Sequence, residues 1–320
     1  MTFQDFCGII ASMIAVFNKY HMILLGSTLA IFLILIIFFL WLRTKSSKAT
    51  KIGIAILLFA NLLLHCLRIV FPPPWANFYP FAYQYITPIS ISAVNAITFP
   101  FIFLMKSRTL KDYMFYFGII TGGLALLVPG NSLGRHYLAF DSIRFFITHG
   151  AICIAPILMV MCGHHRIDWR RAWRAPVIMP VVLAIILVNE IILTAMGIVG
   201  QTMDLLLSDT YRNGAMVFGP EPNGGIASDV MAALTPEIFK TALHDIPRTN
   251  ISKGDTLFWP IIWILVPGAI IFIPTCVIIG IICDPKRFWW DMKVVWYTCT
   301  RQKEKRMRMR PRKLTRLKRH

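Results

Sequence analysis

Apolar residues gather into seven stretches along this chain, and short polar connections separate most of them. A helix rises about 1.5 Å per residue, so about 20 apolar residues cross the roughly 30 Å core of a membrane. The third stretch is short and interrupted by polar residues, and the fourth is also short. The pattern predicts an all-α, polytopic transmembrane helical bundle of about seven spans, at 21–42, 52–70, 88–105, 113–129, 143–162, 176–198 and 257–282.

Positive charge occupies every second connection between these stretches. Of the 33 Lys and Arg residues, 25 lie in connections 43–51, 106–112 and 163–175 or in the tail 283–320. The alternate connections, 71–87, 130–142 and 199–256, hold 5. Positive residues are retained on the cytoplasmic side of membranes. The alternation therefore predicts an odd number of spans, with the N-terminus outside and the C-terminus in the cytoplasm.

Three further segments flank or interrupt the predicted single membrane domain of residues 21–282. Residues 1–20 place apolar side chains at helical spacing, which predicts an amphipathic helix on the outer membrane surface. The long external connection 199–256 contains enough apolar residues to pack as a lid over the bundle. Residues 283–320 form a polybasic cytoplasmic tail.

The composition agrees with a membrane protein, because 57% of the 320 residues are hydrophobic and only 15% are charged. Soluble domains carry about 25% charged residues. We therefore expect a multi-pass protein of the plasma membrane. The chain has no phosphate-binding glycine-rich loop, no HExxH motif and no histidine pairs at metal-ligand spacing. No metal and no cofactor are expected.

The basic tail predicts partners at the inner membrane surface. Residues 301–320 contain 11 Lys and Arg and one acidic residue, and such a run is attracted to anionic phospholipid headgroups. Nonspecific RNA binding is the alternative, and a specific nucleic-acid partner is not expected. His164 and His165 lie beside Arg166 in another inner connection, where a phosphate-contacting surface is expected. A protein partner is left open.

Several predicted spans contain polar residues that are costly to place in lipid. They are His65, Arg68, Ser92, Asn95, Arg144, His149, Asn189 and Glu190. Alternating helix directions place His65, Ser92 and His149 about 6–9 Å, and Glu190 about 12 Å, below the outer boundary. Arg68 and Arg144 fall at the rim. Four helices thus bring polar residues to one level, which predicts a polar cavity facing the outer leaflet.

Three interpretations of this level compete. The arginines can extend their charges to the headgroups, and the other polar residues can pair for stability alone. They can instead line a binding or transport cavity. The third interpretation is catalysis, with Ser92 as the nucleophile, His149 as its base and Glu190 as the residue that orients the base. His65, Arg68, Asn95, Arg144 and Asn189 would then bind the substrate.

Three sequence stretches resemble the YwaF family of integral membrane proteins. They are FNKYHMIL at 17–24, YMFYFGIITGGLALLVPG at 113–130 and FFITHG at 145–150. The similarity covers residues 17–165 and depends on the order and spacing of these stretches. One animal relative of that family is an acyltransferase that builds ether phospholipids with a Cys nucleophile and a His. More distant membrane hydrolases use Thr and His on lipid esters.

The resemblance implies roles for particular residues. His149 matches the fifth-span histidine of the family. Many members have Pro-x-His-x-Cys in the third span, where this chain has PISIS at 88–92. Ser90 stands in the place of the His and Ser92 in the place of the Cys, a departure that argues against thioester chemistry. Acyl transfer or hydrolysis on membrane lipids is the first functional hypothesis, and a noncatalytic transporter, ligand-binding or scaffold protein is the alternative.

Overall fold

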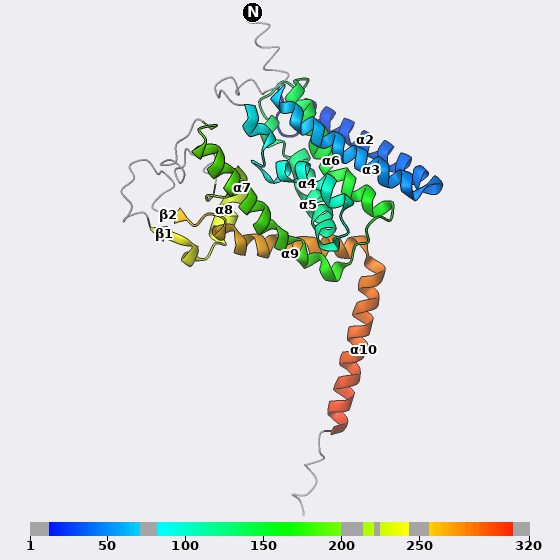
Figure 1. Cartoon of the computed structure of the whole chain (residues 1–320). Helices are drawn as coiled ribbons and strands as arrows, with labels where there is room; N and C mark the ends of the chain where they lie inside the picture. Colours follow the sequence, from blue (N-terminus) through cyan, green and yellow to red (C-terminus); the bar gives the residue numbers. More distant parts are fainter. Residues whose placement is uncertain (1–12, 71–81, 200–213, 221–224, 243–255, 310–320) are drawn as a thin grey trace, which may run out of the picture.

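A computed structural model describes residues 13–70, 82–199, 214–220, 225–242 and 256–309. Most of the expected N-terminal helix at 1–20 lies outside the described residues. Six described helical segments are long and apolar enough to cross a membrane: Lys19–Lys45, Ser47–Ile69, Arg108–Leu127, Phe140–Met161, Trp169–Ala195 and Ile262–Cys283. A shorter apolar helix spans Ile91–Leu104. The predicted polytopic helical bundle is therefore confirmed, and each of the seven predicted stretches contains an apolar helix (Figure 1).

The first two long helices form a hairpin around a single serine. Helix α2 (Lys19–Lys45) ends where the amide of Ser46 donates to the Leu42 carbonyl. The Ser46 side chain then accepts from the Ala49 amide and caps α3 (Ser47–Cys66). Serine at this position satisfies an amide that a helix start leaves without a partner. A 3-10 turn, η1 (Leu67–Ile69), follows α3.

The stretch FNKYHMIL anchors the start of α2 to the bundle. Asn18 caps the helix by accepting from the His21 amide at 2.9 Å. The fully buried His21 ring lies 2.8 Å from the Leu126 carbonyl through Nε2, and its Nδ1 accepts from the Phe17 amide. Because both ring nitrogens bond to backbone groups, this histidine has a structural role.

The third predicted span is shorter in the structure than in the sequence pattern. The 3-10 helix η3 (Ala82–Ile86) precedes α4, which covers only Ile91–Leu104. Fourteen helical residues rise about 21 Å, less than a membrane core. Ser90 caps α4 by accepting from the Ala93 amide. The sequence 88–105 thus begins with a non-helical segment, which the hydrophobic pattern could not distinguish from helix.

Helices α5 (Arg108–Leu127) and α6 (Phe140–Met161) make the most extensive contact in the bundle. A Cβ at Gly118 would stand 2.7 Å from the Ile152 carbonyl, and a Cβ at Gly122 would stand 2.8 Å from the His149 carbonyl. These approaches require glycine, because no side chain fits against backbone atoms there. The GxxxG spacing in the sequence therefore marks a helix contact.

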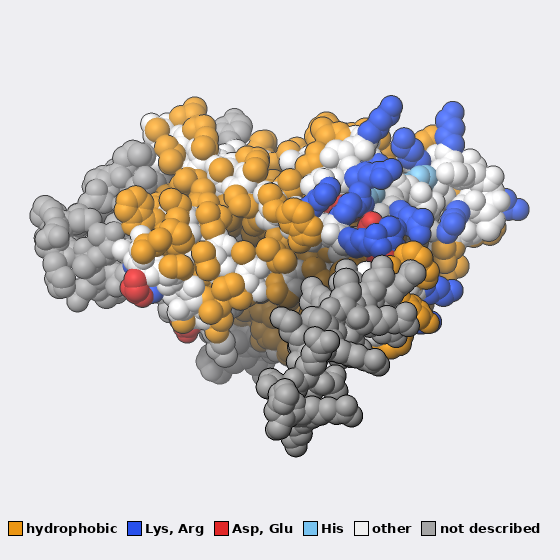
Figure 2. All heavy atoms as spheres, turned by 90° about the horizontal axis from the view of Figure 1, so that it is seen from below, with side chains coloured by type: hydrophobic (Ala, Val, Ile, Leu, Met, Phe, Trp, Pro, Cys, Tyr) orange, Lys and Arg blue, Asp and Glu red, His pale blue; other side chains and the backbone are white. Residues whose placement is uncertain are grey.

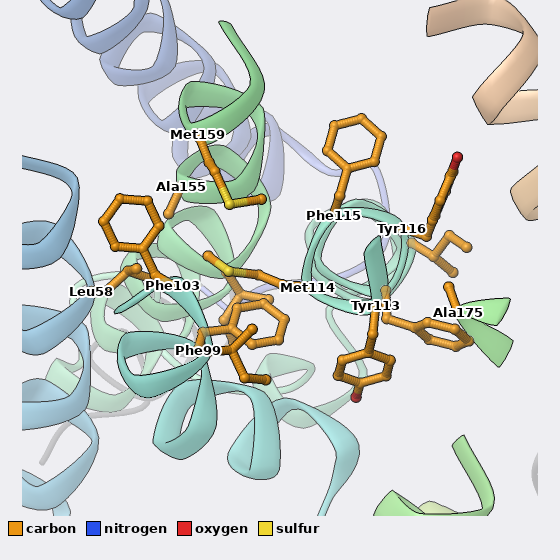
Figure 3. Close-up of a cluster of buried hydrophobic side chains, with 14 of the residues drawn as sticks. Leu58, Phe99, Phe103, Tyr113, Met114, Phe115, Tyr116, Ala155, Met159 and Ala175 are labelled. Atoms are coloured by element: carbon orange, nitrogen blue, oxygen red, sulfur yellow. The ribbon is translucent and has the colours of Figure 1, made fainter. Parts of the chain in front are cut away.

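The main hydrophobic core lies between α3, α4, α5 and α6. Figure 3 shows Phe99 and Phe103 of α4 beside Met114 of α5 and Met159 of α6. Helix α6 is the most buried of these six segments, because 78% of its most apolar stretch lies inside the protein. In the FFITHG stretch, Gly150 lets α2 approach α6, since a Cβ there would stand 3.2 Å from the Thr28 and Phe32 side chains. A short 3-10 helix, η4 (Gly130–Ser132), connects α5 to the loop before α6.

Helices α7 and α9 lie on the opposite side of α4 and α5 from α2 and α3 (Figure 1). The 3-10 helices η5 (Trp169–Arg174) and η6 (Pro176–Ile178) lead into α7 (Met179–Ala195). Helix α9 (Ile262–Cys283) packs against η5. Gly280 makes this contact close, because a Cβ there would stand 3.1 Å from the Trp169 backbone.

The described parts of the connection 199–256 pack against the start of α9. They comprise η8 (Gly214–Met216), α8 (Gly225–Ala233), η9 (Glu237–Phe239) and strand β1 (Lys240–Ala242), which pairs antiparallel with β2 (Thr256–Phe258). Trp263 is fully buried here and donates to the Met216 carbonyl at 2.9 Å. The sequence pattern missed the hairpin because each strand has only three residues. The lid role of this segment stays a prediction.

Helix α10 (Pro285–Met309) projects away from the bundle (Figure 1). Its Asp291 accepts from the Trp169 indole at 3.0 Å and from the Arg170 Nε at 2.7 Å, which ties the start of the helix to η5. Trp289, Trp290 and Trp296 are exposed. Exposed tryptophans beside basic residues suit the headgroup region of a membrane, so lipid contact by this tail stays a prediction.

Candidate functional site

Polar side chains of neighbouring helices bond to η3 and to the extended residues that follow it before α4. His65 bonds through Nε2 to the Ile86 carbonyl at 3.3 Å, and Arg68 donates to the Tyr85 carbonyl at 3.2 Å. Lipid offers no partner to backbone groups, so irregular backbone at membrane depth must be satisfied by protein. His65 and Arg68 perform this task for the segment before α4.

Helix α7 holds the same segment from the other side. Asn189 donates to the Thr87 hydroxyl at 3.1 Å, and that hydroxyl donates to the Gln84 carbonyl at 2.7 Å. Glu190 follows Asn189 and is fully buried. Two of the predicted polar residues of α7 therefore lie on the bundle side of the membrane domain.

Arg144 of α6 and Arg135 of the loop before it share one carboxylate. Arg144 donates through Nε at 3.0 Å and Nη2 at 2.7 Å to Asp141, which also pairs with Arg135. Burial, followed by the positive charge of Arg144, lowers the pKa of Arg135 to about 10. Arg68 lies within electrostatic range of Arg144 and has no carboxylate partner among the described residues. The region therefore attracts anions.

His149 lies one turn further along α6, within electrostatic range of Arg144 and Arg68. Its Nδ1 is 2.8 Å from the Phe145 carbonyl. Because a carbonyl only accepts hydrogen bonds, Nδ1 carries the proton and Nε2 carries the lone pair. Nε2 bonds to no described residue. We call His65, Arg68, Arg144, His149 and Asn189, with the segment 84–90, the helix-break cluster.

Ser92 lies in the first turn of α4, next to this segment. Its Oγ is 3.3 Å from the Oγ of Ser90. No hydrogen bond joins Ser92 to His149 in the described structure. The Phe145 carbonyl occupies the Nδ1 side of His149, which is where an orienting carboxylate such as Glu190 would bind. The structure thus fixes the His149 ring but shows no hydrogen bond between Ser92 and His149.

Asn95 is engaged elsewhere, between α4 and α5. It accepts from the Tyr113 hydroxyl at 2.7 Å and donates to the Thr121 hydroxyl at 3.1 Å. All of its bonds in the described structure hold the two helices together. The sequence could not separate this residue from the helix-break cluster, because its spacing places it on the same stripe as Ser92.

An apolar groove of about 450 Å³ lies between α7 and α9. Leu183, Gly268 and Phe272 line its middle, and Ile91 of α4 contributes to its wall. Ile91 stands between Ser90 and Ser92 in the chain. No sequence pattern predicted this groove, because helices far apart in the chain form it.

A second cavity, of about 530 Å³, has a basic lining. Lys and Arg side chains gather on this part of the face in Figure 2. Its residues come from the predicted connections 106–112 and 163–175 and from the tail that follows α9. Three segments that the charge pattern assigned to the same side of the membrane therefore line one cavity. No group of three His, Cys, Asp or Glu side chains in the described residues can hold a metal ion.

The comparisons with known proteins give one match. A model of the TMEM164 family matches residues 16–211, a range that contains α2 to α7 and every residue of the helix-break cluster. No curated protein and no solved structure matches the chain.

Proposed function

The chain belongs to the TMEM164 family and is a multi-pass membrane protein, and we propose that it transfers or hydrolyses the acyl group of a membrane lipid at the helix-break cluster. The observation that carries this proposal is the tautomer of His149. Its Nδ1 proton is committed to the Phe145 carbonyl, so Nε2 is free to accept a proton. A general base needs a held ring with an available lone pair.

Ser92 is the proposed nucleophile. His149 Nε2 takes the proton of the Ser92 hydroxyl while the oxygen attacks the ester carbonyl of the lipid. The imidazolium then gives this proton to the departing lysolipid oxygen, which leaves an acyl-serine. Attack on the acyl-serine by a second lipid hydroxyl completes transfer, and attack by water completes hydrolysis. Active-site hydrogen bonds are often formed only with substrate present, so the Ser92–His149 contact belongs to that complex.

The charges of the cluster support a phospholipid as substrate. Arg68 has no carboxylate partner among the described residues, and a phosphate group is a natural partner for a guanidinium. The amides at the start of α4 add positive partial charge beside Ser92, where an oxyanion would develop. The Phe145 carbonyl, rather than Glu190, orients the His149 ring in this arrangement.

The apolar groove supports an acyl chain as part of that substrate. Its wall includes Ile91, the neighbour of Ser92, and its volume lies within the usual range for ligand pockets of roughly 300–1,000 Å³. A chain in this groove would place the ester near the start of α4. In this arrangement the helix-break cluster would bind the headgroup of a lipid, Ser92 would attack its ester, and the apolar groove would hold its acyl tail.

Lipid analysis of reconstituted protein tests the proposal. The full chain is placed in vesicles of phosphatidylcholine and phosphatidylethanolamine, and acyl exchange and free fatty acid are measured by mass spectrometry. Removal of a general base lowers rates by about 10²–10⁴-fold, so His149→Gln and Ser92→Ala should lose turnover. Ser27→Ala is the matched control, because Ser27 bonds only to its own helix. Unchanged lipids with the wild-type protein would overturn the proposal.

A transporter or ligand-binding protein is the second candidate function. The observation that favours it is the interrupted third span, because broken helices mark the substrate sites of many transporters. In the same vesicles, this function would move lipid or solute between leaflets without changing acyl composition. Loss of that movement in Arg68→Gln, with normal lipid composition throughout, would favour the second candidate.

A further inference from the structure

The basic cavity described above has no role in the proposed lipid chemistry. Six cationic side chains line it: Lys106, Arg108, Lys111, Arg166, Arg171 and Arg287. Asp168 is the only acidic residue among its lining residues. Figure 2 shows Lys and Arg side chains gathered on one part of the face, beside an apolar surface.

Two of the six cations have acidic partners. Arg171 lies 3.3 Å from Asp112, a fully buried carboxylate that also bonds to His165 at 2.7 Å. Arg287 lies 3.4 Å from Asp168. These pairs account for two of the six cations that line the cavity.

The other four cations have no carboxylate partner in the described structure. They are Lys106, Arg108, Lys111 and Arg166. Surface charges on a membrane protein usually face water and spread apart. Here the four side chains line the basic cavity, so an anion bound there would offset the electrostatic repulsion between their positive charges.

The start of helix α5 strengthens this argument. Ser107 caps α5 by accepting from the Leu110 amide, and the first turn contains no acidic residue. Arg108 and Lys111 lie in that turn, although the positive end of a helix dipole disfavours cations. An anion in the cavity would interact favourably with the helix end and with both side chains. The positive-inside rule explains basic residues on this side of the membrane but not their position around a cavity.

His164 lies between the basic cavity and the connection that joins α2 and α3. Its Nε2 lies 2.8 Å from the Thr50 hydroxyl. Burial, and then the charges of Lys51, Lys111 and Arg43, lower the pKa of this imidazole. Side chains from four connections therefore contribute positive electrostatic potential to the basic cavity.

We propose that the basic cavity binds a phosphate group that carries at least two negative charges, as in a phosphomonoester or a pyrophosphate. Two arginines and two lysines without acidic partners exceed what one phosphodiester charge can neutralise. Guanidinium groups bind phosphate oxygens in pairs, and ammonium groups add point charges. The ligand is either the headgroup of a phosphomonoester lipid or a soluble phosphate compound.

Binding to the purified full chain in detergent tests the proposal. The lipid probe is short-chain phosphatidate, with short-chain phosphatidylcholine as its phosphodiester control. The soluble probe is inorganic pyrophosphate, with sulfate as its control. Calorimetric titration measures each affinity. Binding of phosphatidate alone identifies a lipid source, binding of pyrophosphate alone identifies a soluble source, and binding of both supports recognition of the phosphate itself.

Two double variants separate this cavity from general positive charge. Arg108→Gln with Arg166→Gln removes two charges from the cavity, and we expect affinity to fall about tenfold or more, because charged hydrogen bonds to the phosphate are lost. Lys45→Gln with Lys48→Gln removes two exposed charges outside the cavity lining and should leave affinity within about twofold of the wild type.

Folding of the variants is checked by thermal unfolding without ligand. If the Arg108→Gln, Arg166→Gln double variant does not fold, the single variant Lys106→Gln is used in its place. It should weaken binding by about threefold or more, because one exposed charge–phosphate contact is lost. Equal weakening by the cavity and control variants would overturn the proposal. So would the absence of binding to both phosphatidate and pyrophosphate. Neither result depends on the lipid chemistry proposed for the helix-break cluster.

Discussion

Replacing Gly122 with alanine puts a methyl group against the backbone of α6. The new Cβ would stand 2.8 Å from the His149 carbonyl oxygen and 2.9 Å from the Cys153 amide nitrogen. Real Cβ contacts are longer, and backbone inside a packed helix pair cannot move aside cheaply. Helices α5 and α6 must therefore separate at the point where α6 carries the proposed base.

The size of this effect follows from two opposing contributions. Overpacking a well-filled contact costs about 1–3 kcal/mol. Alanine in place of glycine favours a helix by up to about 1 kcal/mol. Gly123 gives a matched control, because a Cβ there meets nothing within 4 Å. Gly122→Ala should therefore be less stable than Gly123→Ala by about 1–3 kcal/mol.

Denaturation in mixed micelles measures both variants against the wild type. We expect Gly123→Ala to match or exceed the wild type and Gly122→Ala to fall below it. The same displacement moves the His149 backbone, so lipid turnover should also fall in Gly122→Ala and not in Gly123→Ala. Equal stability of the two alanine variants would refute the reasoning about the α5–α6 contact.

Three further predictions follow from other contacts. Asp112→Asn leaves His165 and Arg171 without their buried acid and should destabilise the protein by about 3–5 kcal/mol, measured by the same denaturation. The lowered pKa of His164 means that the unfolded chain binds its proton more readily, so the stability from this group is present above pH about 6.5 and declines as the pH falls through the folded-state pKa. This loss of stability at low pH should be smaller in His164→Gln, measured by denaturation at several pH values. Reporters fused to the two chain ends should read out on opposite sides of the membrane, and readout on one side would contradict the odd number of spans.

The sequence predicted the membrane helices well, because a continuous stretch of about 20 apolar residues is long enough to cross the membrane core and is easy to recognise. It predicted α4 less well. Residues 88–105 are apolar enough to be taken for one span, but the extended backbone at Ser90 makes the helix begin only at Ile91. That backbone is held by side chains of α3 and α7, and one sequence does not show such long-range contacts.

The candidate site was predicted only in part. Helix direction and residue depth brought His65, Arg68, Arg144 and His149 to one level, and the structure places Arg68 and Arg144 within electrostatic range of each histidine. The same argument included Asn95, which is committed to α5. Depth along a helix can be read from sequence, whereas rotation and hydrogen-bond partners depend on packing.

The tautomer of His149 shows why these partners matter. The sequence pointed to a carboxylate as its orienting group, but the structure supplies the Phe145 carbonyl of the preceding turn. A carbonyl fixes the ring without adding charge, so His149 can serve as a base without a buried ion pair. A backbone partner leaves no trace in residue identities, and no motif search could have found it.

Helix α6 also determines how the two proposed sites relate. Arg144 lies near its start, and His164 follows its end, 20 residues later. The 17 helical steps from Arg144 to Met161 rise about 26 Å, close to the thickness of the hydrocarbon core of roughly 30 Å, and His164 lies three residues further. One phospholipid headgroup therefore cannot occupy the helix-break cluster and the basic cavity together. A ligand in the cavity can affect chemistry at His149 only through the position of α6, and the Gly118 and Gly122 contacts hold that helix against α5.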